Sequence, residues 1–86
     1  MALSDKERAI LDFERSWWLV PGPKEAAIQE RLHLSSTSYY RALGELIDSD
    51  DALSYDPLVV RRVRRLRERR RRARYERRSS GERPGR

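Results

Sequence analysis

Apolar residues recur at spacings of three and four along the first half of the chain, and no strand-like alternation is visible. Ser4 and Glu7 have the spacing of a capping box, so a first helix should begin there. It has Ile10, Phe13 and Trp17 at these spacings, with Leu11 and Trp18 one row over, and the tryptophan pair is predicted to be one core residue beside a half-exposed one. The prolines in residues 20–23 should end this helix, because proline has no amide hydrogen to donate.

Two further helices are predicted in the next 25 residues or so. Pro23 suits the first position of a second helix that runs to Leu32, and Ser35 is a suitable cap for a third helix over residues 36–47. The second helix should bury Ala26 or Ala27, Ile28 and Leu32. The third should bury Tyr39, Leu43, Leu46 and Ile47, which leaves Tyr40 to solvent or a ligand.

Residues 48–55 are acidic and predict a loop with at most one helical turn, at Ala52 and Leu53. Asp56-Pro57 is a cap followed by a favoured first residue, so a fourth helix should run over residues 57–78. Its apolar edge is predicted to be Leu58, Val59, Val63 and Leu66. Residues 79–86 should be disordered. We therefore expect an all-α protein of four helices: a core (1–56), an arginine-rich helix (57–78) and a tail (79–86).

Residues 25–43 have the spacing of a helix-turn-helix, in which a second helix enters the DNA major groove. Leu34 should point inward, and His33 stands in the turn where glycine, which tolerates positive φ, is usual. The outward side chains, which we take as candidate DNA contacts, are Ser36, Thr37, Tyr40 and Arg41. An ordinary helical hairpin without groove contacts is the alternative.

Charge is divided sharply at Pro57. The residues before it include six Lys or Arg and eleven Asp or Glu, a net of −5. From Pro57 onward there are fourteen Arg and three Glu, a net of +11. Such a cationic segment favours a polyanionic partner, because neutralising phosphates releases counterions. The candidate phosphate-binding residues are Arg61, Arg62, Arg64, Arg65, Arg69, Arg70, Arg71 and Arg72.

Several classes of function find no support. The chain has no cysteine and one histidine, so no metal site or other cofactor is expected. Neither a catalytic triad nor a glycine-rich phosphate loop is present, and we expect a protein that is not an enzyme. No apolar stretch is long enough for a signal peptide or a membrane span, so we expect a cytoplasmic protein. If it binds DNA, we expect it in the nucleoid.

The chain also resembles a small actinobacterial helix-turn-helix group that is catalogued as a domain of unknown function. The matching stretches are 9–14 (AILDFE), 17–18 (WW), 24–28 (KEAAI), 39–43 (YYRAL), 46–48 (LID) and 56–62 (DPLVVRR). They fall within residues 4–72. The resemblance implies a small DNA-binding protein. Its pattern commonly has Asn where this chain has Gly44, on the same face as Tyr40.

Together these patterns favour a DNA-binding protein, either a transcription regulator or a nucleoid-associated protein. An RNA or ribonucleoprotein binder is the second hypothesis, because arginine-rich segments often fold on RNA. The third is an adaptor that docks on an acidic protein surface, such as one on RNA polymerase. The target sequence and the oligomeric state stay open at this stage.

Overall fold

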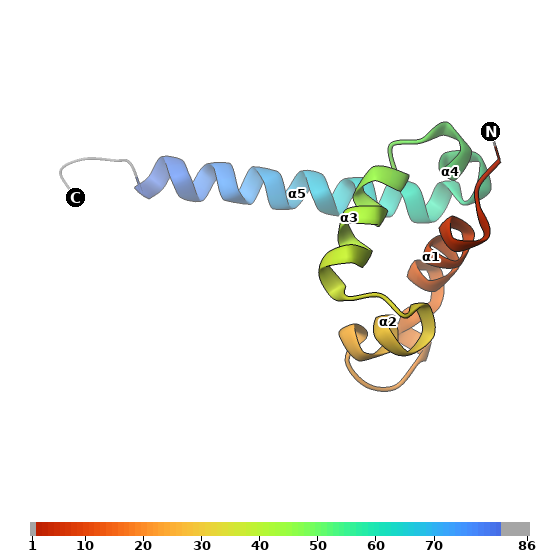
Figure 1. Ribbon diagram of the computed structural model, residues 1–86. Helices are drawn as coiled ribbons and strands as arrows, with labels where there is room; N and C mark the ends of the chain where they lie inside the picture. Colours follow the sequence, from red (N-terminus) through yellow and green to blue (C-terminus); the bar gives the residue numbers. More distant parts are fainter. Residues whose placement is uncertain (1, 82–86) are drawn as a thin grey trace.

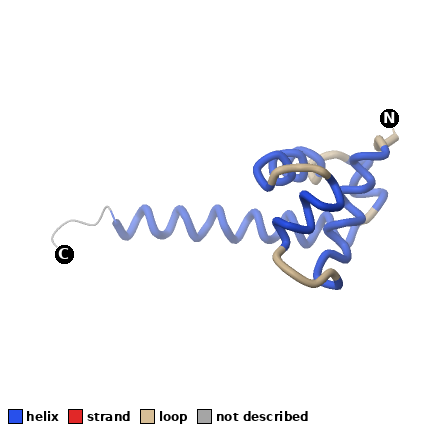
Figure 2. Tube along the Cα trace, turned by 60° about the horizontal axis from the view of Figure 1, so that its bottom comes forward, coloured by secondary structure: helices blue, strands red, loops and turns tan. Residues whose placement is uncertain are grey.

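The computed structural model describes residues 2–81, and the side chains as far as Glu76. The elements are α1 (Asp5–Ser16), a 3₁₀ turn η1 (Trp17–Leu19), α2 (Lys24–Leu32), α3 (Ser36–Leu46), α4 (Asp50–Tyr55) and α5 (Pro57–Gly81). Within that range there is no strand, which confirms the all-α prediction. The first four helices and the first turns of α5 form a head, from which the rest of α5 projects (Figures 1 and 2).

Three of the predicted caps are present. The Ser4 hydroxyl accepts from the Glu7 amide at 3.1 Å, and the Glu7 carboxylate accepts from the Ser4 amide at 2.8 Å. Ser35 caps α3 through its side chain. A side-chain oxygen of Asp56 accepts from the Val59 amide at 3.2 Å at the start of α5. Local sequence therefore fixes where these helices begin, because each cap satisfies an amide that lacks a helical partner.

The structure corrects the expected helix count and several boundaries. Residues 50–55 form a fifth helix, capped by the Ser49 hydroxyl, and this helix buries Ala52 completely. The first helix ends at Ser16 and continues as η1, and Pro23 is the N-cap of α2 rather than its first residue. α5 extends past the expected end to Gly81, and the rest of the predicted tail, 82–86, lies outside the described residues.

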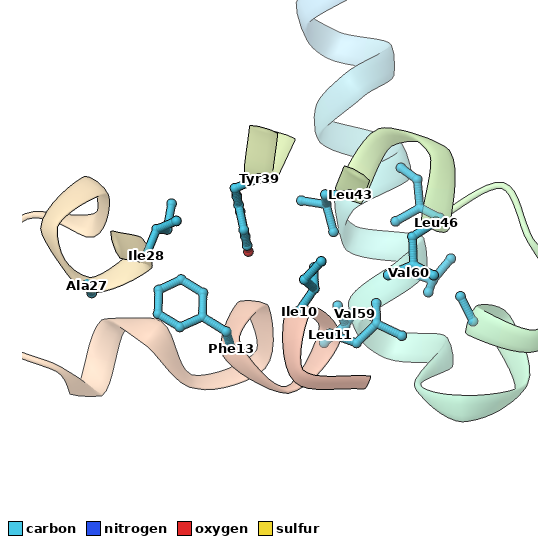
Figure 3. Close-up of a cluster of buried hydrophobic side chains, with 12 residues drawn as sticks. Ile10, Leu11, Phe13, Ala27, Ile28, Tyr39, Leu43, Leu46, Val59 and Val60 are labelled. Atoms are coloured by element: carbon cyan, nitrogen blue, oxygen red, sulfur yellow. The ribbon is translucent and has the colours of Figure 1, made fainter. Parts of the chain in front are cut away.

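The core lies where α1, α3 and the first turns of α5 meet, with α2 at one end and α4 at the other (Figure 3). It contains Ile10, Leu11, Phe13, Ala27, Ile28, Tyr39, Leu43, Leu46, Ile47, Ala52, Val59 and Val60. Leu58 was expected in the apolar edge of the last helix but is 76% exposed, whereas Val60 is fully buried. α5 contacts both α1 and α4, so its two adjacent valines are covered from two sides.

Candidate nucleic-acid interface

The turn between α2 and α3 has the conformation that the sequence predicts. His33 is in the left-handed region, with φ 59° and ψ 37°, and its amide donates to the Gln29 carbonyl at 2.9 Å. Leu34 is partly buried against the core, and Ser35 then caps α3. A three-residue turn therefore joins α2 to α3, and the two helices pack against each other.

A buried polar network ties the first three helices together. Glu14 of α1, with a side chain only 6% exposed, accepts hydrogen bonds from the Lys24 ammonium at 3.1 and 3.3 Å. The Tyr39 hydroxyl of α3 also donates to Glu14. Burial, and to a lesser extent the hydrogen bond to Glu14, raises the pKa of Tyr39 well above its ordinary value, so the hydroxyl remains a donor. These three groups fix α3 relative to α1 and α2.

The outward residues of α3 lie largely as expected. Thr37, Tyr40 and Arg41 are exposed, and Ser36 is half-buried. The Tyr40 ring packs edge-on against that of Tyr39, with centroids 5.0 Å apart. The Lys24 ammonium lies 5.1 Å from the centroid of the Tyr40 ring, which also favours a single ring position.

A hollow of about 490 Å³ lies between α3 and α5. Its apolar lining includes Leu43 and Ile47 of α3 and Val63, Leu66 and Ala73 of α5. Its cationic lining is Lys24, Arg67, Arg70 and Arg74, and Tyr40 and Gly44 also border it. Of the predicted contacts, the hollow thus brings Tyr40 and Arg70 together. Glu14, the one carboxylate among its described lining residues, is already paired with Lys24.

Among the α5 side chains that the structure describes, three arginines bind groups on the head. Arg62 donates to the Glu14 carbonyl at 2.8 Å, with its guanidinium 5.2 Å from the centroid of the Trp18 ring. Arg64 donates to the Ile47 carbonyl at 2.7 Å, just beyond the end of α3. Arg67 binds the Asp48 carboxylate. The first two were expected on phosphates, but the structure uses their donors to hold α5 on the head.

Other arginines of α5 are exposed and have no ion pair or hydrogen bond within the part of the chain that the structure describes. They are Arg61, Arg65, Arg69, Arg70, Arg72 and Arg74. Arg71 lies 3.8 Å from Glu68. Arg61 and Arg65 border a second, more open depression with Arg64 and Glu68. The free guanidinium groups therefore lie on more than one side of α5.

Sequence reasoning missed three basic residues of the first hollow. Arg67 and Arg74 lie three before and four after Arg70, so the helical period alone could have placed all three on one face. Lys24 is remote in sequence, and only the packing of α2 on α3 brings it to Tyr40. No group of side chains in the described range could hold a metal ion. Among the helices of residues 2–81, none is sufficiently long and apolar to cross a membrane.

Comparison with known proteins connects this arrangement to one family. No curated protein and no solved structure matches the chain significantly. A family model described as "Protein of unknown function (DUF3263)" matches residues 2–75, which include the whole head and most of α5. The match covers the three-helix network, the hollow and the free arginines alike, and the chain belongs to this family.

Proposed function

We propose that the protein binds double-stranded DNA and catalyses no reaction. On this proposal α2 and α3 form a helix-turn-helix, with α3 in the major groove and α5 along the phosphates. One observation carries it: Tyr40 of α3 and the cations Arg70 and Arg74 of α5 line the same hollow. A duplex in that position meets side chains that suit base edges and side chains that suit phosphates.

The geometry of α2 and α3 supports the helix-turn-helix. A left-handed residue stands in a three-residue turn, at His33, and the residues that pack the two helices together include the buried Ile28 and Tyr39. The Glu14–Lys24 pair adds a polar tie between α1 and α2. A rigid pair of helices of this kind allows α3 to present Thr37 and Arg41 to a groove without reorganisation.

The charge distribution supports a duplex on the side of the hollow. Of the four cations that line it, Lys24 is paired with Glu14 and Arg67 with Asp48, which leaves Arg70 and Arg74 free to neutralise phosphates. Residues 1–56 carry a net charge of −5 and residues 57–86 a net charge of +11, so the attraction for a duplex is concentrated on the segment that contains α5. If about six phosphates are neutralised, log K should fall with log[salt] with a slope of about −5.

Fluorescence anisotropy of a labelled duplex at several salt concentrations tests this proposal. Replacing Arg70 and Arg74 together with alanine should weaken binding and reduce the magnitude of the salt slope by about 2, because two phosphate contacts are lost. Lys6→Ala is the control, because this exposed residue belongs to the first turn of α1, at the end of the head remote from the projecting part of α5 (Figure 1). If the intact protein binds no duplex at low ionic strength, the proposal is wrong.

A second experiment separates base reading from phosphate binding. Arg41→Ala should weaken one preferred sequence selectively, whereas Arg74→Ala, which removes a free guanidinium group from the hollow, should weaken all sequences alike. Arg64 is unsuitable for the second substitution, because its loss also removes the bond to the Ile47 carbonyl. Equal losses on every duplex from both variants would leave a nonspecific, nucleoid-type binder.

A protein partner is the second candidate, favoured by the apolar floor of the hollow at Leu43, Ile47 and Leu66. An acidic helix with one apolar face would match this floor and its arginine rim. A pull-down after nuclease treatment that recovers one stoichiometric partner, with no duplex affinity, would favour such an adaptor. Competition between duplex DNA and structured RNA at one salt concentration tests the RNA alternative.

A further inference from the structure

We propose that α5 carries two separate DNA-binding faces, so that a single chain bridges two duplexes. This inference rests on the proposed function and extends it: the hollow takes the first duplex, and the opposite face of α5 takes a second. On this inference the protein holds two DNA segments together as well as binding a single site.

The arginines of α5 form two stripes along the helix. The inner stripe is Arg67, Arg70 and Arg74, at spacings of three and four, and all three line the hollow. The outer stripe is Arg61, Arg65, Arg69 and Arg72, at spacings of four, four and three. Residues three or four apart share one face of a helix, so each stripe is a continuous row.

The two stripes lie on opposite sides of the helix. Arg65 and Arg67 are two residues apart, as are Arg72 and Arg74, and two residues correspond to about 200° of rotation. The surface hollows agree with this: the depression beside Arg61 and Arg65 shares no lining residue with the hollow beside Arg70. A duplex seated in the first hollow therefore cannot reach the outer stripe.

The outer stripe is available to a ligand. All four of its side chains are exposed, and none has an ion pair or hydrogen bond in the described part of the chain. Arg61 and Arg72 are 11 residues apart, so the four arginines occupy about 16 Å of helix, and Leu58 and Glu76 stand beyond the two ends of the stripe. The partner is identified by charge: four guanidinium groups in a row suit the phosphates of one nucleic-acid backbone.

Holding two duplexes on one helix is physically reasonable. An α-helix with its side chains is about 10 Å across, and the Debye length at physiological ionic strength is about 8 Å, so most of the repulsion between the duplexes is screened. The guanidinium groups of both stripes also lie between the two duplexes. Because α5 projects from the head, no other helix in the described part of the chain covers either face of its projecting part (Figures 1 and 2).

A bridging assay tests the inference directly. An unlabelled duplex is fixed to beads, the full-length protein is added, and recovery of a second, labelled duplex is measured. Two variants of equal charge are compared: Arg65→Ala with Arg69→Ala on the outer stripe, and Arg70→Ala with Arg74→Ala on the inner stripe. All four side chains are exposed, and circular dichroism of both variants checks that they fold.

The outer variant should recover about tenfold less labelled duplex, while its affinity for one duplex changes much less. The inner variant should lose affinity for a single duplex, because Arg70 and Arg74 line the hollow that takes the first duplex. Recovery by the outer variant equal to that of the unmodified protein would overturn the inference, because bridging would then come from self-association. If the unmodified protein binds one duplex but recovers no second, only bridging is wrong; if it binds neither, the proposed function is wrong.

Discussion

Arg67 of α5 donates two hydrogen bonds to Asp48, at 3.2 and 2.9 Å, and so holds α5 against the chain just after α3. This pair borders the hollow, because Arg67 also lines it. Together with the bond from Arg64 to the Ile47 carbonyl, it fixes the angle at which α5 leaves the head. The shape of the proposed DNA site therefore depends on contacts that no single helix contains.

The Asp48–Arg67 pair predicts a pH dependence of stability. The hydrogen bond from Arg67 lowers the pKa of Asp48 below its ordinary value of 3.8, so the folded state binds this proton less tightly than the unfolded state. The contribution is present above about pH 4 and is lost as the pH falls below it. Asp48→Asn should therefore lower the urea midpoint at pH 6 and lose its effect near pH 2.

Glu45→Gln is the control for that measurement, because Glu45 is exposed on α3 and has no ion pair within the described residues. A difference between Asp48→Asn and the unmodified protein that stayed constant from pH 6 to pH 2 would contradict the assignment, since it would not follow the titration of the carboxylate.

Gly44 and Gly22 predict opposite responses to the same substitution. A Cβ atom added at either position would meet nothing within 4 Å. Gly44 lies inside α3, where alanine is favoured, so Gly44→Ala should stabilise the protein by about 1 kcal/mol. Gly22 has a φ of +94°, so Gly22→Ala should destabilise it by about 1 kcal/mol or more. Thermal unfolding of both variants is the measurement, and shifts of the same sign would contradict this reading.

The buried Glu14–Lys24 pair predicts strong coupling between two residues. Lys24→Met leaves the Glu14 carboxylate, 6% exposed, without a counter-charge, and should cost about 3 kcal/mol. Adding Glu14→Gln removes that charge and keeps an acceptor for Tyr39, so the double variant should be more stable than Lys24→Met alone. Urea unfolding of the unmodified protein, the two single variants and the double variant completes a double-mutant cycle. Additive losses would show that the pair is not coupled.

Tyr39 predicts a late step in an alkaline titration of tyrosine absorbance. The raised pKa means that the folded state holds this proton more tightly than the unfolded state, whose value is 10.0. Stability should therefore be intact below about pH 10 and fall as the pH rises above it, and Tyr39 should ionise only as the protein unfolds. Tyr39→Phe should lack this last step, whereas Tyr75→Phe, an exposed control, should retain it.

Much of the fold follows from short-range signals in the sequence. Ser4, Ser35 and Asp56 predict three helix starts, and a cap acts only on amides two or three residues away. The positive φ of His33 follows from its place in a short turn. The fifth helix was missed because residues 50–55 are too few to show a helical period, and Ala52 is their one fully buried residue.

The sequence by itself determined the helices and the inward rows within them, such as Tyr39 and Leu43, because backbone geometry repeats every 3.6 residues whatever lies beside the helix. It also determined that positive charge is gathered after Pro57.

Only the tertiary structure decided which arginines are free. The acceptors for Arg62, Arg64 and Arg67 are 48, 17 and 19 residues away in sequence, and helix packing alone brings them within reach. Packing likewise buries Val60 and exposes Leu58. The physical reason is that a helical period specifies the face of a residue, whereas its partner is set by whichever helix covers that face.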